Sequence, residues 1–359
     1  MVKLKKRTKV AIAMSGGVDS SVAAYLLSQQ EKYDVTGIYM RNWSEELPEI
    51  KGCPWETDQR DAQLVADQLK IPFYVVNFEK EYYELVVQYM IDNYQRGLTP
   101  NPDVMCNQEI KFGVFLDKVL NLGFDLMATG HYASVSKINN QYYIGQAKDL
   151  NKDQSYFLAR LKDEQIRHTI FPLSNLTKPK IRKIAKQIKL PVADKKDSQG
   201  ICFIGNIKVR DFLKRKFKGT PGKIIDIHNK KILGQHQGVE FFTIGQREGI
   251  EVGGTGPYYV VNKSLKSGNL FVTNNIDDPL LISKQLILHS VRWLAASPKQ
   301  PLKCGVRIRY RDKIIPCQVL IKHKLITVKL AAGQRAVTPG QVAAFYDQQG
   351  IIIGSGIIA

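Results

Sequence analysis

Apolar and polar positions along the first part of the chain alternate between short apolar runs and longer amphipathic stretches. The apolar runs predict strands over residues 10–14, 35–40, 73–78 and 126–129. The stretches between them carry apolar side chains at helical spacing and predict helices over residues 21–29, 61–70, 79–94 and 110–120. This βαβα order is typical of a parallel sheet with helices on both faces, which binds its ligand beyond the carboxyl ends of the strands.

The pattern changes after about residue 217. A turn signal, Gly-Thr-Pro-Gly, spans residues 219–222, and short β-type runs punctuated by glycines follow to about residue 282. From Leu286 to the end the pattern is again all β. The chain is therefore expected to hold an α/β domain followed by two small β domains.

An alternation of apolar and basic residues lies within the last of these domains. The apolar residues are Val306, Ile308 and Tyr310, and the basic ones are Arg307, Arg309 and Arg311. A period of two predicts a strand that places the three arginines on one face.

The chain is strongly basic. It has 52 Lys and Arg against 33 Asp and Glu, a net charge of +19, which indicates a polyanionic partner: nucleic acid, an anionic membrane or a nucleotide. The basic residues concentrate over 178–218 and 299–335. Phosphate contact suits such clusters, and the alternative is a solvated charged face; we favour RNA for the two clusters together.

Apolar run lengths and cysteine spacing narrow the class of protein. No run approaches the roughly 18 apolar residues of a membrane-spanning helix, and residues 10–14 are too few for the core of a signal peptide. The five cysteines are far apart and form no CxxC pair, which favours a reducing compartment and disfavours both a disulfide framework and a zinc ribbon. We expect a cytoplasmic protein, with the mitochondrial matrix as the alternative.

The most informative motif is SGGVDS, which directly follows the first predicted strand and opens a helix. The two glycines let a ligand approach the backbone, and the serine hydroxyls together with the free N–H groups of the helix start suit a pyrophosphate. The lysine of a Walker A loop is absent, so this loop is of another kind and needs little of the positive charge. Its aspartate, Asp19, is explained by magnesium coordination or by helix capping.

Two further segments place a cysteine among polar groups. Residues 99–107 (TPNPDVMCN) put Asp103 three residues before Cys106, in a proline-stiffened loop that precedes the helix predicted from residue 110. Residues 197–205 (DSQGICFIG) put Cys202 after a glycine turn and near two lysines. Helix N-termini and nearby cations favour the thiolate, so Cys106 and Cys202 are the candidate reactive cysteines. For Cys53, Cys304 and Cys317 we prefer a structural role as small buried hydrophobes.

The SGGVDS loop matches the ATP pyrophosphatases, which split ATP into AMP and pyrophosphate. With TPNPDVMCNQEIKFG, ATGHYA, NKDQSYFL, DSQGICFIG and FFTIGQREGI in this order, essentially the whole chain resembles the tRNA-specific 2-thiouridylases of the MnmA/TrmU family. The resemblance implies a Rossmann-like domain of the adenine nucleotide alpha hydrolase type over 1–210, a central small β domain over 211–283 and a C-terminal β-barrel over 284–359. It also implies a monomer that binds tRNA and receives sulfur from a sulfur carrier or a cysteine desulfurase.

The resemblance further implies the reaction and its residues. ATP, with magnesium near Asp19, adenylates the C2 oxygen of the wobble uridine, and persulfide sulfur on Cys202 replaces that oxygen to give 2-thiouridine and AMP. Cys106 is the second thiol, a nucleophile or the partner of Cys202 in a transient disulfide, and Asp103 is a general acid/base or orients the base. The implied ATP-binding residues are Ala13, Met14, Ser15, Gly16, Gly17, Val18, Asp19, Ser20, Met40 and Gly130. The implied target-base residues are Asn101, Pro102 and Asp103, and the implied tRNA contacts are His131, Lys152, Asp153, Gln154, Arg309, Tyr310 and Gln341.

Three alternatives remain open at the level of sequence. An iron–sulfur cluster on Cys106, Cys202 and Asp103 would replace the persulfide. Another ATP pyrophosphatase activity, amidating or ligating a small metabolite, would leave the basic β domains unexplained. A non-enzymatic RNA-binding protein would have a degenerate ATP site, against which the intact SGGVDS loop argues.

Overall fold

The computed structural model describes residues 7–44, 54–197, 208–250, 252, 256–294, 298, 301–322 and 325–359. Two compact units divide the chain. The first comprises Met1–Val86, Asp103–Asn206 and Gln349–Ile353, and the second comprises Val87–Pro102, Ile207–Gln348 and Gly354–Ala359.

A five-stranded parallel sheet in the order β3-β2-β1-β4-β7 is the centre of the first unit. Its strands are β1 (Thr8–Ala13), β2 (Tyr33–Arg41), β3 (Phe73–Asn77), β4 (Leu126–Ala128) and β7 (Thr169–Ile170). Val10 and Ile12 join the core on one face, whereas Ala11 points to the opposite face and is just as inaccessible. Both faces of β1 are therefore covered, which explains its uninterrupted apolar sequence and confirms the predicted parallel sheet.

Three helices share one core with this sheet. They are α1 (Val18–Ser28), α2 (Pro54–Leu69) and α8 (Lys178–Gln187). Val22, Val65 and Ile181, one from each helix, are fully buried in that core, and α1 contacts both of the other helices. Because α1 follows β1 directly and α8 lies against α1, side chains at the start of α8 can reach the loop between β1 and α1.

Two longer helical stretches contain π-helical segments. The helix predicted over 79–94 is confirmed as α3 (Glu79–Tyr82), η1 (Tyr83–Val87) and α4 (Gln88–Gln95). The helix predicted over 110–120 begins earlier, as α5 (Pro102–Met105), η2 (Cys106–Val114) and α6 (Phe115–Asn121). The expectation that Asp103 and Cys106 lie in a loop before the helix is wrong, because both are helical. Pro102 is the first residue of α5, where its missing N–H costs no hydrogen bond.

A β-hairpin completes the first unit. Strands β5 (Ser134–Ile138) and β6 (Gln141–Gly145) are antiparallel and are joined by Asn139 and Asn140, which both take positive φ as a tight hairpin turn requires. The amide of Gln146 donates to the carbonyl of Gly350 over 3.0 Å, and Gly145 forms a β-bridge with Ile351. Residues from near the end of the chain thus belong to the first unit. The short elements η3 (Ser155–Leu158) and α7 (Asp163–Arg167) also lie here.

The second unit contains a four-stranded sheet in the order β10-β11-β8-β9. Its strands are β8 (Gly222–Asp226), β9 (Ile232–His236), β10 (Tyr259–Ser264) and β11 (Asn269–Thr273). The helix α9 (Val209–Lys216) precedes β8 in the sequence, and η4 (Val239–Phe241) lies between β9 and β10. Ile224, Val260, Leu270 and Val272 form its core. The predicted run of short strands is confirmed.

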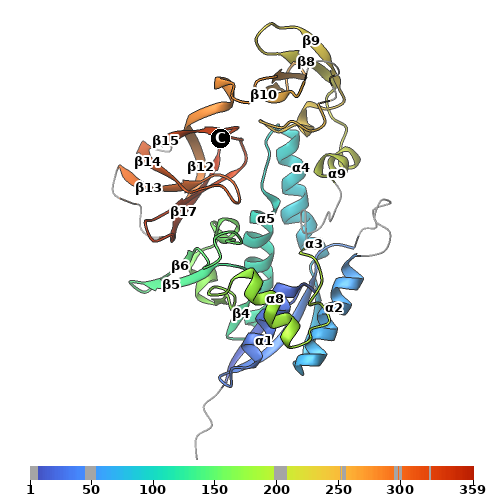
Figure 1. Ribbon diagram of the computed structural model, residues 1–359, viewed down its shortest axis with the longest axis vertical. Helices are drawn as coiled ribbons and strands as arrows, with labels where there is room; N and C mark the ends of the chain where they lie inside the picture. Colours follow the sequence, from blue (N-terminus) through green and yellow to red (C-terminus); the bar gives the residue numbers. More distant parts are fainter. Residues whose placement is uncertain are drawn as a thin grey trace, which may run out of the picture. The chain divides into compact units, whose positions relative to one another are not determined.

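A closed barrel in the order β12-β15-β14-β13-β16-β17 follows in the same unit (Figure 1). Its strands are β12 (Ile282–Trp293), β13 (Leu302–Arg307), β14 (Ile315–Lys322), β15 (Leu325–Arg335), β16 (Val342–Tyr346) and β17 (Ile352–Ile358), after the short helix η5 (Pro279–Leu281). Pairing of β12 with both β15 and β17 closes the barrel. The expected fold class, an α/β domain with a small β domain and a β-barrel, is confirmed.

The alternating arginines of the barrel do not lie on one strand, so that prediction is wrong. Strand β13 ends at Arg307, because its pairing with β14 stops at Val306 and its pairing with β16 stops at Arg307. Arg307 is buried, with its guanidinium 5.2 Å from the ring centre of Tyr346, and Arg311 takes a positive φ in the turn that follows. Sequence periodicity carries no information about where a partner strand ends.

Helix length and hydropathy also bear on membrane insertion. Within the described part of the chain, no helix combines the length and the apolar character needed to cross a bilayer.

Candidate functional site

The SGGVDS loop closes on itself at the carboxyl end of β1. The amide of Ser15 donates to Oγ of Ser20 over 3.1 Å, the two serine hydroxyls lie 3.1 Å apart, and Oγ of Ser20 donates to the carbonyl of Gly17 over 3.1 Å. Gly16 has φ +69°, and a Cβ there would lie 2.2 Å from the backbone oxygen of Asp58. Only glycine therefore fits this position, because the backbone of α2 presses against the loop.

The residues expected to bind ATP converge at one edge of the sheet. Ala13 ends β1, Met40 lies near the end of β2, and Gly130 comes after β4, which is the strand next to β1. A Cβ on Gly130 would lie 2.7 Å from the amide nitrogen of Ser20, so this glycine lets β4 approach the first turn of α1. The carboxyl ends of neighbouring parallel strands and an open helix N-terminus form the usual position of a phosphate-binding site.

Asp19 projects from the first turn of α1 and contacts two donors. Its Oδ1 accepts from the hydroxyl of Tyr132 over 2.7 Å, and both its carboxylate oxygens lie 2.8 Å from Nζ of Lys178. The capping alternative is wrong, because the N-cap of α1 is Gly17 and makes no side-chain capping bond. Burial of the Tyr132 hydroxyl and the adjacent Asp19 carboxylate raise the pKa of Tyr132, which stays a hydrogen-bond donor.

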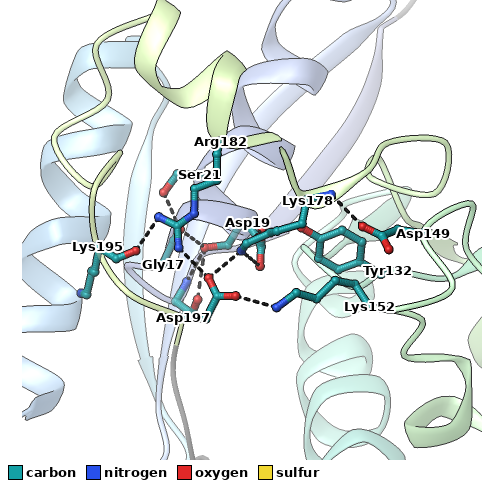
Figure 2. A network of polar contacts seen from close by, with 12 residues as sticks. Gly17, Asp19, Ser21, Tyr132, Asp149, Lys152, Lys178, Arg182, Lys195 and Asp197 are labelled. Carbon is teal, nitrogen blue, oxygen red and sulfur yellow. Dashed lines mark hydrogen bonds and ion pairs between the residues drawn. The ribbon is translucent and has the colours of Figure 1, made fainter. Parts of the chain in front are cut away.

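Asp197 lies beside Asp19 and accepts from three cations. Nζ of Lys152, Nζ of Lys178 and a guanidinium nitrogen of Arg182 each lie 2.7 Å from its carboxylate, and Figure 2 shows them pointing at it. Partial burial acts to raise the pKa of Asp197, but hydrogen bonds and charge from Lys152 and Lys178 hold this pKa well below its ordinary value. Lys178, whose side chain is 11% exposed, thus joins the two carboxylates.

Local structure accounts for the position of these cations. Lys178 and Arg182 are four residues apart on α8 and so lie on one face of the helix. The amide of Lys178 donates to the carboxylate of Asp149 over 2.8 Å, which satisfies one of the free N–H groups at the helix start. The first turn of α8 is thereby held with Lys178 directed at Asp19 of the SGGVDS loop, while Arg182, one turn later, reaches Asp197 (Figure 2).

The chain segment that leads to Asp197 is tied down at two points. Nζ of Lys195 lies 2.7 Å from the carboxylate of Asp58 and 2.5 Å from that of Asp61, both on α2. Arg182 donates to the carbonyl oxygen of Lys195 over 2.5 Å. Burial opposes the charge on Lys195, but its hydrogen bonds to the two aspartates raise its pKa overall.

Sequence reasoning missed this network. Lys178 and Arg182 were counted only as members of the basic cluster over 178–218, and Lys195 was noted only in that cluster and as a cation near Cys202. Tyr132, Asp149 and Asp197 were assigned no role. The available signal was the i, i+4 spacing of Lys178 and Arg182 at the start of a helix. Their pairing with aspartates distant in sequence needed the fold.

Three residues expected to contact tRNA follow Asn151 on one turn. Of the three, Lys152 reaches outward to Asp197. Asp153 is 2% exposed, and its carboxylate accepts from Ser155 Oγ over 2.9 Å and from the amide of Ala147 over 3.2 Å. The side-chain oxygen of Gln154 accepts from the amide of Tyr132 over 3.0 Å. Asp153 and Gln154 therefore hold the backbone of this turn and of the Tyr132 segment.

His131 packs in an aromatic cluster. Its ring centre lies 5.9 Å from that of Phe112 and 6.2 Å from that of Phe171, and its Nδ1 lies 2.7 Å from the hydroxyl of Thr129. Burial, aided by the charge of Lys111, lowers the pKa of His131 well below its ordinary value. The ring is therefore neutral at pH 7.

Within the second unit, Gln341 holds the segment that leads to Asn101. Its side-chain nitrogen donates to the carbonyl of Thr99 over 2.8 Å and to that of Pro100 over 3.3 Å. The amide of Thr99 donates to the carbonyl of Pro339 over 2.9 Å. The barrel thus fixes the backbone just before the residues expected to bind the target base.

Of the two candidate cysteines, Cys106 lies among the described residues and Cys202 does not. Cys106 is 1% exposed, one helical turn after Asp103, whose carbonyl accepts from the side chain of Asn107 over 3.0 Å. The spacing of three residues puts Asp103 and Cys106 on one side of the helical stretch. Cys202 and its expected disulfide with Cys106 lie outside the described residues, as does Cys53.

The last expected tRNA contacts lie on the turn after β13. A guanidinium nitrogen of Arg309 donates to the carbonyl of Ala336, and the Tyr310 ring lies under the guanidinium of Arg311 at 5.1 Å. The turn is thus anchored to the end of β15 rather than extended as a strand.

The parallel sheet and its SGGVDS loop define a HUP-type α/β domain. Residues 8–206 match the family model of the tRNA methyl transferase HUP domain, residues 210–274 that of the tRNA methyl transferase PRC-barrel domain, and residues 283–358 that of the aminomethyltransferase beta-barrel domain. Relatives that match nearly the full length narrow the family further. The chain belongs to the MnmA family of tRNA-specific 2-thiouridylases.

Three of these relatives show how complete the similarity is. The chain is 45% identical to the tRNA-specific 2-thiouridylase MnmA of Alkaliphilus oremlandii, over 97% of this chain and 96% of the relative. It is 44% identical to that of Nitrosomonas europaea, over 98% of each, and 44% identical to the tRNA-specific 2-thiouridylase MnmA 1 of Geobacillus kaustophilus, over 98% of this chain and 96% of the relative.

Proposed function

We propose that this protein thiolates the wobble uridine of tRNA at C2 in an ATP-dependent reaction. As a member of the MnmA family it is a tRNA-specific 2-thiouridylase, with tRNA as its substrate. The single observation that carries the proposal is the family match over nearly the whole chain, joined to an intact SGGVDS loop. The described geometry of that loop supports the ATP half of the reaction.

The cations around Asp197 support a site for the phosphates of ATP. Lys152, Lys178 and Arg182 converge on one carboxylate next to the open N-terminus of α1. A phosphate offers the same acceptor oxygens with more charge, so these three side chains can exchange Asp197 for the nucleotide. Magnesium would enter with the phosphates, where Asp19 faces them and Lys178 can balance the negative charge.

Adenylation solves the chemical difficulty of replacing a carbonyl oxygen. In the proposed route the C2 oxygen of the uridine attacks the α-phosphorus of ATP and pyrophosphate leaves, so that the oxygen later departs as part of AMP. Donors fixed around the phosphates favour this step because they stabilise charge that develops on the leaving group. The helix dipole of α1 adds to that stabilisation.

Sulfur transfer requires two thiols in the proposed route. The terminal sulfur of a persulfide on Cys202 attacks C2, AMP leaves, and attack by Cys106 on the Cys202 sulfur forms a disulfide and leaves sulfur on the base. In the second version, Cys106 attacks the persulfide first and releases the sulfur that then attacks C2. Asp103, one turn before Cys106, is placed to orient the base or to exchange a proton with it.

The remaining assignments follow from the resemblance and are part of the proposal. Asn101, Pro102 and Asp103 bind the target base, and His131, Lys152, Asp153, Gln154, Arg309, Tyr310 and Gln341 act in tRNA binding, some of them by holding the backbone. The domains span 1–210, 211–283 and 284–359. The protein acts as a cytoplasmic monomer and takes sulfur from a carrier protein or a desulfurase.

Reconstitution with purified components tests the proposal. The protein is incubated with ATP, a persulfide donor and unmodified tRNA, and the nucleosides are analysed by mass spectrometry for 2-thiouridine. Cys106→Ser and Cys202→Ser should each abolish the product but keep the tRNA-dependent release of pyrophosphate, whereas Asp19→Ala should abolish AMP formation and keep tRNA binding. Full activity in both cysteine variants would refute the mechanism. An iron requirement would favour the cluster alternative, and AMP release driven by a small acid without tRNA would favour a metabolite ligase.

A further inference from the structure

Two cysteines face each other across neighbouring strands of the barrel. Cys304 on β13 and Cys317 on β14 are register partners in an antiparallel pair. Their Sγ atoms lie 3.6 Å apart. Directly opposed residues of antiparallel strands have Cα separations of about 4.5–5.5 Å, within the range that a disulfide spans without movement of the backbone.

The surroundings of the two thiols differ from each other. On the same face, the neighbouring register pairs are Leu302 with Val319 and Val306 with Ile315, so the cysteines are flanked by apolar side chains. Cys317 is 6% exposed, whereas Cys304 is half-buried. A small solute can therefore reach Cys304, and Cys317 is within reach of whatever forms on Cys304.

The hydrogen bond between the thiols divides their roles. The bond from Cys317 lowers the pKa of Cys304, although burial opposes this. The same bond, together with burial, raises the pKa of Cys317. Cys304 is thus the thiol that ionises first, and the thiolate is the form that reacts with oxidants.

We propose that Cys304 and Cys317 form a redox-active dithiol, a modification site that a hydroperoxide converts to an intramolecular disulfide. The Cys304 thiolate attacks the terminal oxygen of the hydroperoxide, the O–O bond breaks, and an alcohol or water leaves while Cys304 becomes a sulfenic acid. Cys317 then attacks the Cys304 sulfur, the S–S bond forms, and water leaves with the proton of the Cys317 thiol. The two thiols lose two electrons and two protons in total, and the peroxide accepts them.

The location gives this modification a structural consequence. The two cysteines are 13 positions apart in sequence, and the turn between their strands carries Arg309 and Tyr310. A disulfide would tie the base of this turn and restrict its motion.

Peptide mapping of the oxidised full-length protein tests the proposal. The protein is treated with hydrogen peroxide, free thiols are blocked with iodoacetamide, and the chain is digested with trypsin without reduction. Cleavage after Lys303, Arg307, Lys313 and Lys322 separates peptide 304–307 (CGVR) from peptide 314–322 (IIPCQVLIK). We expect these two peptides to appear joined, with a mass lower by two hydrogens than their sum, and to separate on reduction.

Single substitutions distinguish the two roles. In Cys317→Ser the sulfenic acid on Cys304 should persist and react with dimedone, and in Cys304→Ser the thiol of Cys317 should stay unmodified at the same peroxide dose. Recovery of both wild-type peptides in blocked, unjoined form would overturn the proposal, and so would equal oxidation of Cys317 with and without Cys304. The wild-type measurement decides alone if a variant does not fold. None of these results depends on thiolation activity.

Discussion

The ammonium group of Lys178 lies 2.8 Å from both carboxylate oxygens of Asp19, although the two residues are 159 positions apart in sequence. Asp19 belongs to the SGGVDS loop, which we propose binds ATP, and Lys178 begins a helix in the basic cluster that sequence alone assigned to RNA contact. The pair shows that part of the basic cluster over 178–218 serves the interior of the first unit.

Lys178→Ala should therefore impair the ATP half of the reaction. Removing one fixed donor that stabilises developing charge typically lowers a rate by about 100-fold or more, and we expect a loss of this order in AMP formation. Binding of tRNA should change little. The AMP that is released in the presence of tRNA is measured by chromatography.

The matched control is Lys180→Ala, an exposed lysine on the same helix. It should retain AMP formation within about twofold, as is usual for a solvated surface charge. Near-normal turnover in Lys178→Ala, or an equal loss in Lys180→Ala, would contradict a role for Lys178 at the phosphates.

Gly16→Ala should disrupt the SGGVDS loop for a steric reason, in addition to the strain of placing alanine at a positive φ. The added Cβ would meet the backbone oxygen of Asp58 at 2.2 Å, so either the loop or α2 must move. We expect AMP formation to fall to background. Gly123→Ala is the control, because Gly123 also has positive φ but nothing lies within 4 Å of its Cβ position. It should cost only about 1 kcal/mol of unfolding free energy and leave turnover intact; similar behaviour of the two variants would refute the steric explanation.

Stability should depend on pH through His131. The folded state lowers the pKa of His131 below its ordinary 6.5, so as pH falls below that value the unfolded chain binds a proton that the folded chain does not. The free energy of unfolding should thus fall between pH 7 and pH 5, by up to about 1.4 kcal/mol per pH unit from this group. Urea unfolding at several pH values measures it. His131→Gln should flatten the profile; an unchanged slope in this variant would contradict the prediction.

Gln341→Ala should lower the catalytic efficiency with tRNA and leave the KM for ATP unchanged. The substitution removes the donor to the carbonyls of Thr99 and Pro100, which loosens the backbone just before the proposed base-binding residues. We expect kcat/KM for tRNA to fall about tenfold, the effect of losing roughly 1.4 kcal/mol of positioning, with KM for ATP unchanged. The exposed Gln348→Ala serves as the control. A rise in KM for ATP in Gln341→Ala would mean that the substitution acts on the fold as a whole.

The sequence was informative where structure is local. The apolar run of β1 and the SGGVDS loop predicted the parallel sheet and the turn that joins β1 to α1, because strand burial and loop conformation depend on adjacent residues. The pairing of Lys178 with Asp19 and Asp197 could not be predicted in this way, since it depends on α8 packing against α1. The three cations needed the fold before they could be assigned to one site.

The ends of helices and strands were predicted less well than their existence. Pro102 reads as a loop residue, yet it starts a helix, because the first helical turn needs no N–H at that position. The alternation around Arg309 reads as a strand, yet the ladder stops at Arg307, where the partner strands stop. The first error arose because a proline fits both a loop and the first position of a helix, and the second because partner strands decide where a strand ends.

The β-bridge between Gly145 and Ile351 sets the order in which the molecule can be finished during synthesis. The hairpin of the first unit acquires its last backbone partner only after the ribosome has made residues 349–353, by which time the barrel strands before them have been translated. The first unit therefore remains incomplete while most of the second unit is translated. Premature termination after residue 348 would remove part of the barrel and would also leave one edge of the first unit open.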